Sequence, residues 1–299
     1  MQTTALTFGK YGSKFFAGLN VIQLIAWVAV LNAQGAQALS GLNLPISFPM
    51  TCIILAVLVA GWVYVGLRRS SKITTIVMIV LTILLAILSI KLYILPGILT
   101  SSIQSPALGF WNIFEISIAM SISWLPVISD YTKDVKKPVV ATLISSLAYS
   151  IASLWMYFIG VEIACIGTNN VAQAILTAGL GTTGIIIMVL STVTTNFLAT
   201  NSTGESAKAI YDKINPKHAG LVVSVLSAML AISGIMNHYI NFLYLISSVF
   251  APMTAVQLVS YYYGKENNAL EKINYWNIIS WVAGFITYQV VSSQSSVIL

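Results

Sequence analysis

The chain has 299 residues, of which 58% are hydrophobic and only 7% are charged. Soluble domains usually carry about 25% charged residues, so this composition excludes a water-exposed globular surface. A net charge of +6 would suggest a nucleic-acid partner for a soluble protein, but in a membrane protein basic residues are judged by their loop positions. We therefore expect the lipid bilayer as a partner, and no nucleic acid.

Apolar stretches of about 20 residues, the length of a membrane-spanning helix, recur from one end of the chain to the other. No linker rich in proline, serine or charge divides them, so residues 1–299 are expected to form one transmembrane domain. The sequence predicts an all-α, polytopic membrane protein with about nine spans. The predicted spans are 15–38, 47–67, 73–95, 108–129, 138–160, 184–203, 219–236, 239–262 and 274–292.

The positions of lysine and arginine predict the orientation, because positively charged loops stay on the cytoplasmic side. With a cytoplasmic N-terminus, thirteen of the fourteen basic residues fall in inside loops and only Lys91 falls outside. The thirteen are Lys10, Lys14, Arg68, Arg69, Lys72, Lys133, Lys136, Lys137, Lys208, Lys213, Lys217, Lys265 and Lys272. An odd number of spans leaves the C-terminus outside. The expected location is the cell (plasma) membrane.

The first apolar run has an alternative interpretation. Lysines before it and small residues after it are also typical of a cleaved signal peptide. However, the run is longer than a typical signal and carries Asn20, Gln23 and Trp27, a polar stripe that favours a packed spanning helix.

The fourth span contains two residues that a passive anchor would not need. Glu115 lies inside the apolar run, where an acid costs about 2.5–3.5 kcal/mol on insertion scales. It marks a pathway or binding site, or else lies near the outer mouth and is hydrated or paired with Lys91. Pro126 lacks a backbone donor and clashes with the carbonyl of Ile122, which predicts either a simple kink or a break. Transporters use broken helices to expose polar backbone to a cavity.

The sixth span is rich in hydroxyl groups in its second half. Ser191, Thr194 and Thr195 follow helical spacing, and Asn201 with Ser202 extends the same face. Hard oxygen atoms on one face suit a small hard cation such as sodium. The alternative is that these hydroxyls bond to carbonyls of the preceding turn and serve close packing.

Amides and a tryptophan share one face of the first span: Asn20, Gln23, Trp27 and Gln34 recur at helical spacing. Trp27 lies too deep for the interfacial aromatic belt. An aromatic face beside amides can stack on and hydrogen-bond a flat heterocycle, although packing against a neighbouring helix is an equal alternative. Trp124 is either a second such aromatic or a belt residue.

Four segments carry a family likeness: FGKYGSKFFAGLNVIQLIAWVAV at 8–30, SISWLPVISDYTK at 121–133, VLSTVTTNFL at 189–198 and NFLYLISSVFAPMTAVQLVSYYY at 241–263. In this order, and with the rhythm of the spans, they resemble the nucleobase:cation symporter family of cytosine, purine and hydroxymethylpyrimidine permeases. The hydroxymethylpyrimidine branch is the most similar. The string SWLPVISDYTK before a basic loop is the most specific of these motifs.

The resemblance implies an inverted five-plus-five repeat, with two discontinuous helices meeting at the midplane around substrate and cation. It also implies a secondary active transporter that works by alternating access. Such a permease would import a pyrimidine-type nucleobase or a thiamine precursor such as hydroxymethylpyrimidine or cytosine. No cofactor is expected beyond a coupling cation. The hydroxyl cluster favours sodium as the coupling ion, while Glu115 leaves proton coupling as the alternative.

Carried over residue by residue, the resemblance assigns Trp27 as the aromatic stacking face and Trp124 as the opposing aromatic. Thr194 and Thr195 match the hydroxyl pair of the family's sodium site, together with the carbonyl of Ser191. These roles are implied by the resemblance alone.

The family's amides match less well. The one that grips the heterocycle falls near Thr200 or Asn201, and a second falls at Leu31. The candidate substitutes for the second amide are Gln23, Asn32 and Gln34. The Glu115 carboxylate would accept hydrogen bonds from the amino group and the ring nitrogen of an aminopyrimidine, if that nitrogen is protonated.

Family members normally have twelve spans, and the first and ninth spans here match the family's third and eleventh. Two helices at the start and one at the end are therefore expected to be missing, including one that supplies carbonyls to the sodium site. A truncated, non-transporting remnant or a partner subunit is the resulting alternative. An enzyme is not expected, because His218 and His238 lie in loops and the spans contain no HExxH, paired Asp or Ser–Lys arrangement.

Overall fold

The computed structural model describes residues 2–41, 45–65, 67–94, 109–132, 135–165, 171–264 and 271–298. Within these ranges the chain is helical and contains no strand, which confirms an all-α protein. The helices are α1 (Ala5–Ser40), α2 (Phe48–Val65), α3 (Leu67–Ile94), α4 (Phe110–Ile122), α5 (Leu125–Thr132), α6 (Pro138–Cys165), α7 (Val171–Thr177), α8 (Gly181–Ile210), α9 (Pro216–Ile232), α10 (Tyr239–Val259) and α11 (Tyr275–Ile298). Short 3₁₀ segments cover Gln2–Thr4 and Ile235–His238, and a π-helical turn, Ser260–Gly264, follows α10.

Seven helical segments of the described chain are long and apolar enough to cross a membrane. They are Ala5–Ser40, Phe48–Val65, Thr74–Ile94, Phe110–Ile128, Pro138–Cys165, Gly181–Ile210 and Ile235–Gly264. The predicted span 219–236 overlaps α9, which is apolar but has only 17 residues, and the predicted span 274–292 overlaps α11. The membrane-spanning character expected from the composition is therefore confirmed.

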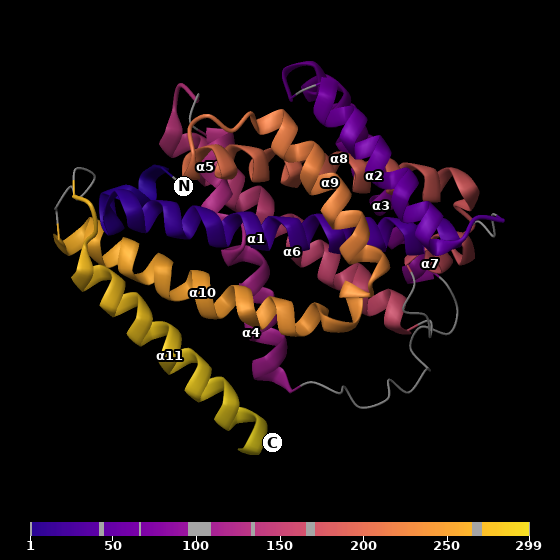
Figure 1. Cartoon of the computed structure of the whole chain (residues 1–299). Helices are drawn as coiled ribbons and strands as arrows, with labels where there is room; N and C mark the ends of the chain where they lie inside the picture. The colour runs from indigo at the N-terminus through magenta and orange to yellow at the C-terminus, as the bar shows by residue number, and fades with distance from the viewer. Residues whose placement is uncertain are drawn as a thin grey trace.

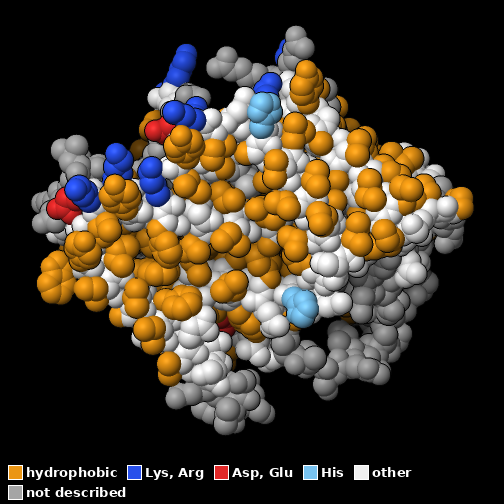
Figure 2. Space-filling model, in the orientation of Figure 1, with side chains coloured by type: hydrophobic (Ala, Val, Ile, Leu, Met, Phe, Trp, Pro, Cys, Tyr) orange, Lys and Arg blue, Asp and Glu red, His pale blue; other side chains and the backbone are white. Residues whose placement is uncertain are grey.

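The outer surface is apolar, as a lipid-facing surface requires. Helix α6 exposes Leu143, Leu147, Ile151 and Leu154 along its length. Hydrophobic side chains cover most of the visible face of the molecule, and the lysine and arginine side chains on that face gather along its upper-left rim (Figure 2). An exposed apolar area of this extent marks a membrane contact surface.

Helix α1 runs through the middle of the bundle and packs antiparallel to α8 (Figure 1). Near its start, the Asn20 side chain donates a hydrogen bond to the Ser206 hydroxyl at 2.7 Å. Near its end, a Cβ atom at Gly35 would lie 3.0 Å from the side chain of Thr192. Successive contacts thus join higher-numbered residues of α1 to lower-numbered residues of α8, so the two helices run antiparallel.

Helix α1 begins before the predicted span, at Ala5, and contains a distortion at Gly9. Gly9 has φ 76°, a left-handed value that glycine adopts without a steric penalty. The amides of Lys10 and Tyr11, freed by this distortion, donate to the carbonyls of Glu271 and Lys272 at 3.0 and 2.9 Å. The start of α1 is thereby joined to the segment that leads into α11.

Basic residues at opposite ends of the bundle can be told apart. Lys10 and Lys272 lie together at the end where α1 begins, which we call the basic end. Lys91 lies at the other end, where its ammonium group is 3.5 Å from the carbonyl oxygen of Gly179, just before α8. This arrangement agrees with the predicted separation of Lys91 from the other basic residues, while the side that faces the cytoplasm stays a prediction.

Candidate functional site

The sequence left either a kink or a break at Pro126, and the structure shows the helix interrupted just before this residue. Helix α4 ends at Ile122, α5 begins at Leu125, and Ser123 and Trp124 form a turn between them. The amides of Val127 and Ile128 both donate to the Trp124 carbonyl, at 3.1 and 2.9 Å. In a continuous helix the amide of Val127 would donate to Ser123, so the break leaves the Ser123 carbonyl without its helical partner.

A glutamine of α1 supplies the missing partner. The Gln23 side-chain amide donates to the Ser123 carbonyl at 3.0 Å and to the Asn20 side-chain oxygen at 2.8 Å. Asn20 in turn donates to the Ser206 hydroxyl of α8. All three side chains are buried, and a buried acceptor left unpaired costs about 1–3 kcal/mol. Gln23, predicted to bind substrate, thus joins α1, the break and α8.

A cavity of about 200 Å³, which we call the central cavity, lies beside this junction. Its walls come from α1, from the break between α4 and α5, and from α8. The lining residues are Leu24, Trp27, Leu31, Met120, Ser123, Trp124, Val127, Thr195, Ala199 and Ser202. Three residues that the sequence predicted as site residues, Trp27, Trp124 and Thr195, therefore meet at one cavity.

Trp27 is held by other aromatic rings. Phe242 and Tyr239 of α10 pack edge-to-face against it, with ring centroids 5.4 and 6.1 Å away. These contacts hold the indole without using its polar edge. Its buried Nε1 has no hydrogen-bond partner among the described residues. Trp27 therefore lines the central cavity as an aromatic wall that the rings of α10 hold in place.

The hydroxyl cluster of α8 divides into two parts. The Thr194 hydroxyl is fully buried and donates to the Ser191 carbonyl at 2.8 Å, as expected for a packing role. Thr195 lines the central cavity instead. Asn201 is half-buried and does not line the cavity, whereas its neighbour Ser202 does. Among the residues described, no cluster of three or more His, Cys, Asp or Glu side chains could hold a metal ion.

Glu115 does not line the central cavity. It accepts a hydrogen bond from the Tyr288 hydroxyl of α11, whereas Lys91, the partner predicted from the sequence, contacts Gly179. The acid on α4 therefore joins two helices some turns away from Trp124.

The other amides proposed for α1 also point elsewhere. Asn32 is buried against α2 and donates to the Cys52 carbonyl at 3.1 Å, while Gln34 is exposed. Leu31, which occupies the family's amide position, does line the cavity.

Sequence reasoning missed Ser123 and Ser206. Each pairs with a residue at least 100 positions away along the chain, so no local pattern marks it. The polar stripe on α1 was the available signal, because buried amides in a spanning helix need partners on other helices.

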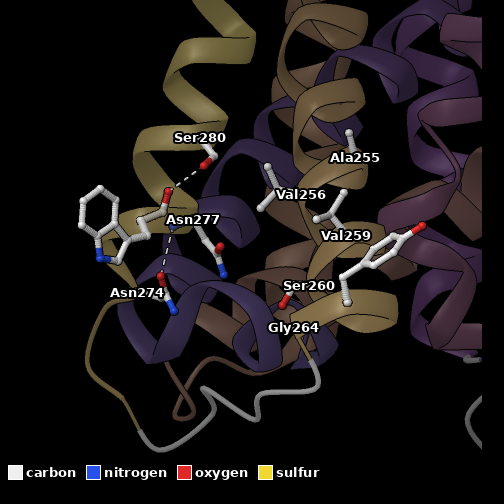
Figure 3. Close-up of a pocket in the computed structure, with 10 residues that line it drawn as sticks. Ala255, Val256, Val259, Ser260, Gly264, Asn274, Asn277 and Ser280 are labelled. Carbon is white, nitrogen blue, oxygen red and sulfur yellow. Dashed lines mark hydrogen bonds between the residues drawn. The ribbon is translucent and has the colours of Figure 1, made fainter.

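A larger cavity of about 540 Å³, the rim cavity, lies at the basic end between the end of α10 and the start of α11 (Figure 3). Several of its polar groups already have partners within the protein. The Ser280 hydroxyl donates to the Trp276 carbonyl, the Asn277 backbone amide to the Asn274 side-chain oxygen, and the Asn277 side chain to the Thr7 carbonyl. None of the predicted site residues lines it. The central cavity is therefore the better candidate, despite its smaller volume.

A scan against models of protein families found no match to this chain, and a search of curated proteins found none either. The likeness to the nucleobase:cation symporters therefore rests on the four segments at 8–30, 121–133, 189–198 and 241–263, and it stays a proposal.

Proposed function

We propose that this protein is a secondary active transporter that carries a small, flat heterocycle of the pyrimidine type across the cell membrane. The observation that carries the proposal is the convergence of Trp27, Trp124 and Thr195 on one cavity at a helix break. Broken helices at the midplane are a recurring way for transporters to form a substrate site. A passive membrane anchor would have no use for such a break.

The size of the central cavity supports a ligand with a single ring. Pockets for drug-sized ligands usually measure about 300–1,000 Å³, and this cavity has about 200 Å³. Its lining combines two indole rings with apolar side chains and a few hydroxyl groups. A pyrimidine base or a hydroxymethylpyrimidine offers a π face to the rings of Trp27 and Trp124 and polar ring edges to the hydroxyl groups of the lining.

The finer architecture belongs to the same proposal. We infer an incomplete inverted five-plus-five repeat, with about nine spans in this chain and with the basic end in the cytoplasm. A central antiparallel pair, α1 and α8, beside one broken helix is compatible with that arrangement. Sodium is the favoured coupling ion, with Thr195 as the hydroxyl available at the cavity, the Thr194 hydroxyl on the adjacent residue and the Ser191 carbonyl one turn earlier.

Equilibrium binding tests the proposal. Purified protein is titrated with radiolabelled cytosine and hydroxymethylpyrimidine in the presence of sodium, for the parent, Trp27→Phe and Trp27→Leu. Stacking contributes about 1–3 kcal/mol per base, so Trp27→Leu should weaken binding by about 5- to 150-fold. Trp27→Phe should retain part of the affinity because it keeps a π face.

Trp276→Leu is the matched control, since Trp276 is an exposed tryptophan at the rim cavity and should not affect heterocycle binding. The proposal fails if the folded parent binds neither heterocycle saturably. It also fails if Trp27→Leu and Trp276→Leu bind as tightly as the parent.

A further inference from the structure

We propose that Gln23 is a positioning residue that holds the helix break closed on the basic-end side of the central cavity. The inference rests on the proposed function, because it concerns access to the same cavity. The structural basis is the hydrogen-bonded chain from Ser206 through Asn20 and Gln23 to the Ser123 carbonyl.

These hydrogen-bonded side chains lie between the central cavity and the basic end of the bundle. On α1, Asn20 and Gln23 precede the cavity residues Leu24 and Trp27 and so lie nearer the basic end. On antiparallel α8, Ser206 lies beyond the cavity residue Ser202 in the same direction. Asn20, Gln23 and Ser206 are 0%, 4% and 3% exposed, so all three lie in the packed interior on that side of the cavity.

The chemistry of the chain explains why a glutamine is needed. The Ser123 carbonyl lost its helical donor at the break and lies in an interior where water is scarce. Gln23 has a donor on a side chain long enough to reach it while remaining bonded to Asn20. The Gln23 Oε1 has no partner among the described residues, so the amide is oriented by its donors alone. The turn formed by Ser123 and Trp124, which is part of the cavity wall, is thereby joined to α1.

Asn32 provides a matched comparison on the same helix. It is also a buried amide, it also donates to a backbone carbonyl, that of Cys52, and its side-chain oxygen also lacks a partner among the described residues. It differs in facing α2 instead of the break. A loss of general stability should therefore affect both positions, whereas a loss of cavity closure should affect only Gln23.

The test uses a single reporter cysteine, Ala199→Cys, in a protein whose Cys52 and Cys165 are replaced by Ala and Ser. Ala199 lines the central cavity. The full chain is reconstituted in vesicles, and a membrane-impermeant maleimide is added from the side of the basic end or from the other side. The variants Gln23→Met and Asn32→Leu keep the approximate size of each side chain and remove the amide.

Gln23→Met should raise the labelling rate from the basic-end side about fivefold or more, the factor expected when a buried hydrogen bond is lost. Asn32→Leu should leave that rate unchanged. Ser206→Ala removes only the last hydrogen bond of the series, the one that Asn20 donates to Ser206. It should therefore raise the labelling rate less than Gln23→Met does. If Gln23→Met folds poorly, as judged by size-exclusion profile and melting temperature, Ser206→Ala alone decides.

The proposal is overturned if Gln23→Met, or Ser206→Ala in its place, labels at the rate of the parent. Equal acceleration by Asn32→Leu would also overturn it. This readout needs no substrate, so it stays distinct from the heterocycle titration. A parent that binds no heterocycle would refute the proposed function while the labelling rates still judge the role of Gln23.

Discussion

The centre of the molecule and its outer shell use polar and apolar side chains in opposite ways. Around α1 and α8, polar residues such as Asn20, Thr194 and Thr200 are fully buried and hydrogen-bonded. On α6, large apolar residues such as Leu147 and Ile151 are exposed. In lipid, polar groups must find partners inside the bundle, which reverses the pattern of a soluble protein. The interior of this bundle is therefore the place to look for function.

The two cavities repeat the same contrast. The rim cavity is larger, but its side-chain amides and hydroxyls hold the start of α11 in place. The central cavity is smaller, yet it is lined by Trp27, Trp124 and Thr195. The kinds of residue that line a cavity are thus more informative about binding than the volume of the cavity.

The largest expected effect is on stability, and it comes from replacing a glycine of the centre, compared with replacing a glycine of the outer shell. A Cβ atom at Gly204 of α8 would lie 2.4 Å from the Pro216 carbonyl oxygen, and one at Gly160 of α6 would meet no atom within 4 Å. Gly204→Ala should destabilise the protein by about 1–3 kcal/mol or more, because the backbone of α9 must move. Gly160→Ala should have no such cost.

Melting temperatures of both alanine variants in the same detergent measure this difference. A Gly204→Ala protein as stable as the Gly160→Ala protein would show that the close approach of α8 to the start of α9 is not maintained.

A smaller effect is expected from one hydroxyl group at the cavity wall. Thr195→Val preserves shape and removes a candidate sodium ligand, so sodium should stimulate heterocycle binding less, by about fivefold or more. Thr192→Val is the control, because the Thr192 hydroxyl donates within its own helix to the Met188 carbonyl. Binding isotherms at several sodium concentrations check the prediction. Equal sodium dependence in the parent and Thr195→Val would remove Thr195 from the cation site.

The sequence predicted the all-α membrane class and a kink or break at Pro126, because hydrophobic length and proline chemistry are local properties. The predicted count of about nine spans is not confirmed, since seven helical segments of the described chain are long and apolar enough to cross a membrane. The sequence also predicted Trp27, Trp124 and Thr195, three residues that share the central cavity. It placed Glu115 and Asn201 at the same site, where the structure does not bring them. Which face of a helix meets which neighbour depends on packing between distant segments, and one chain alone does not encode that visibly.

The role of Gln23 shows the same limit. Its position on a polar stripe marked it as a residue in need of a partner. Only the fold shows that the partner is the Ser123 carbonyl, freed by a break 100 residues further along the chain.

Protection of a cysteine by substrate tests the central claim most directly. Ala199→Cys reports on the central cavity and Ser280→Cys on the rim cavity. In the presence of sodium, saturating hydroxymethylpyrimidine or cytosine should slow maleimide labelling of Ala199→Cys and leave Ser280→Cys unchanged. Unaltered labelling of Ala199→Cys at concentrations that saturate binding, or protection of Ser280→Cys alone, would contradict a substrate site between Trp27 and Trp124.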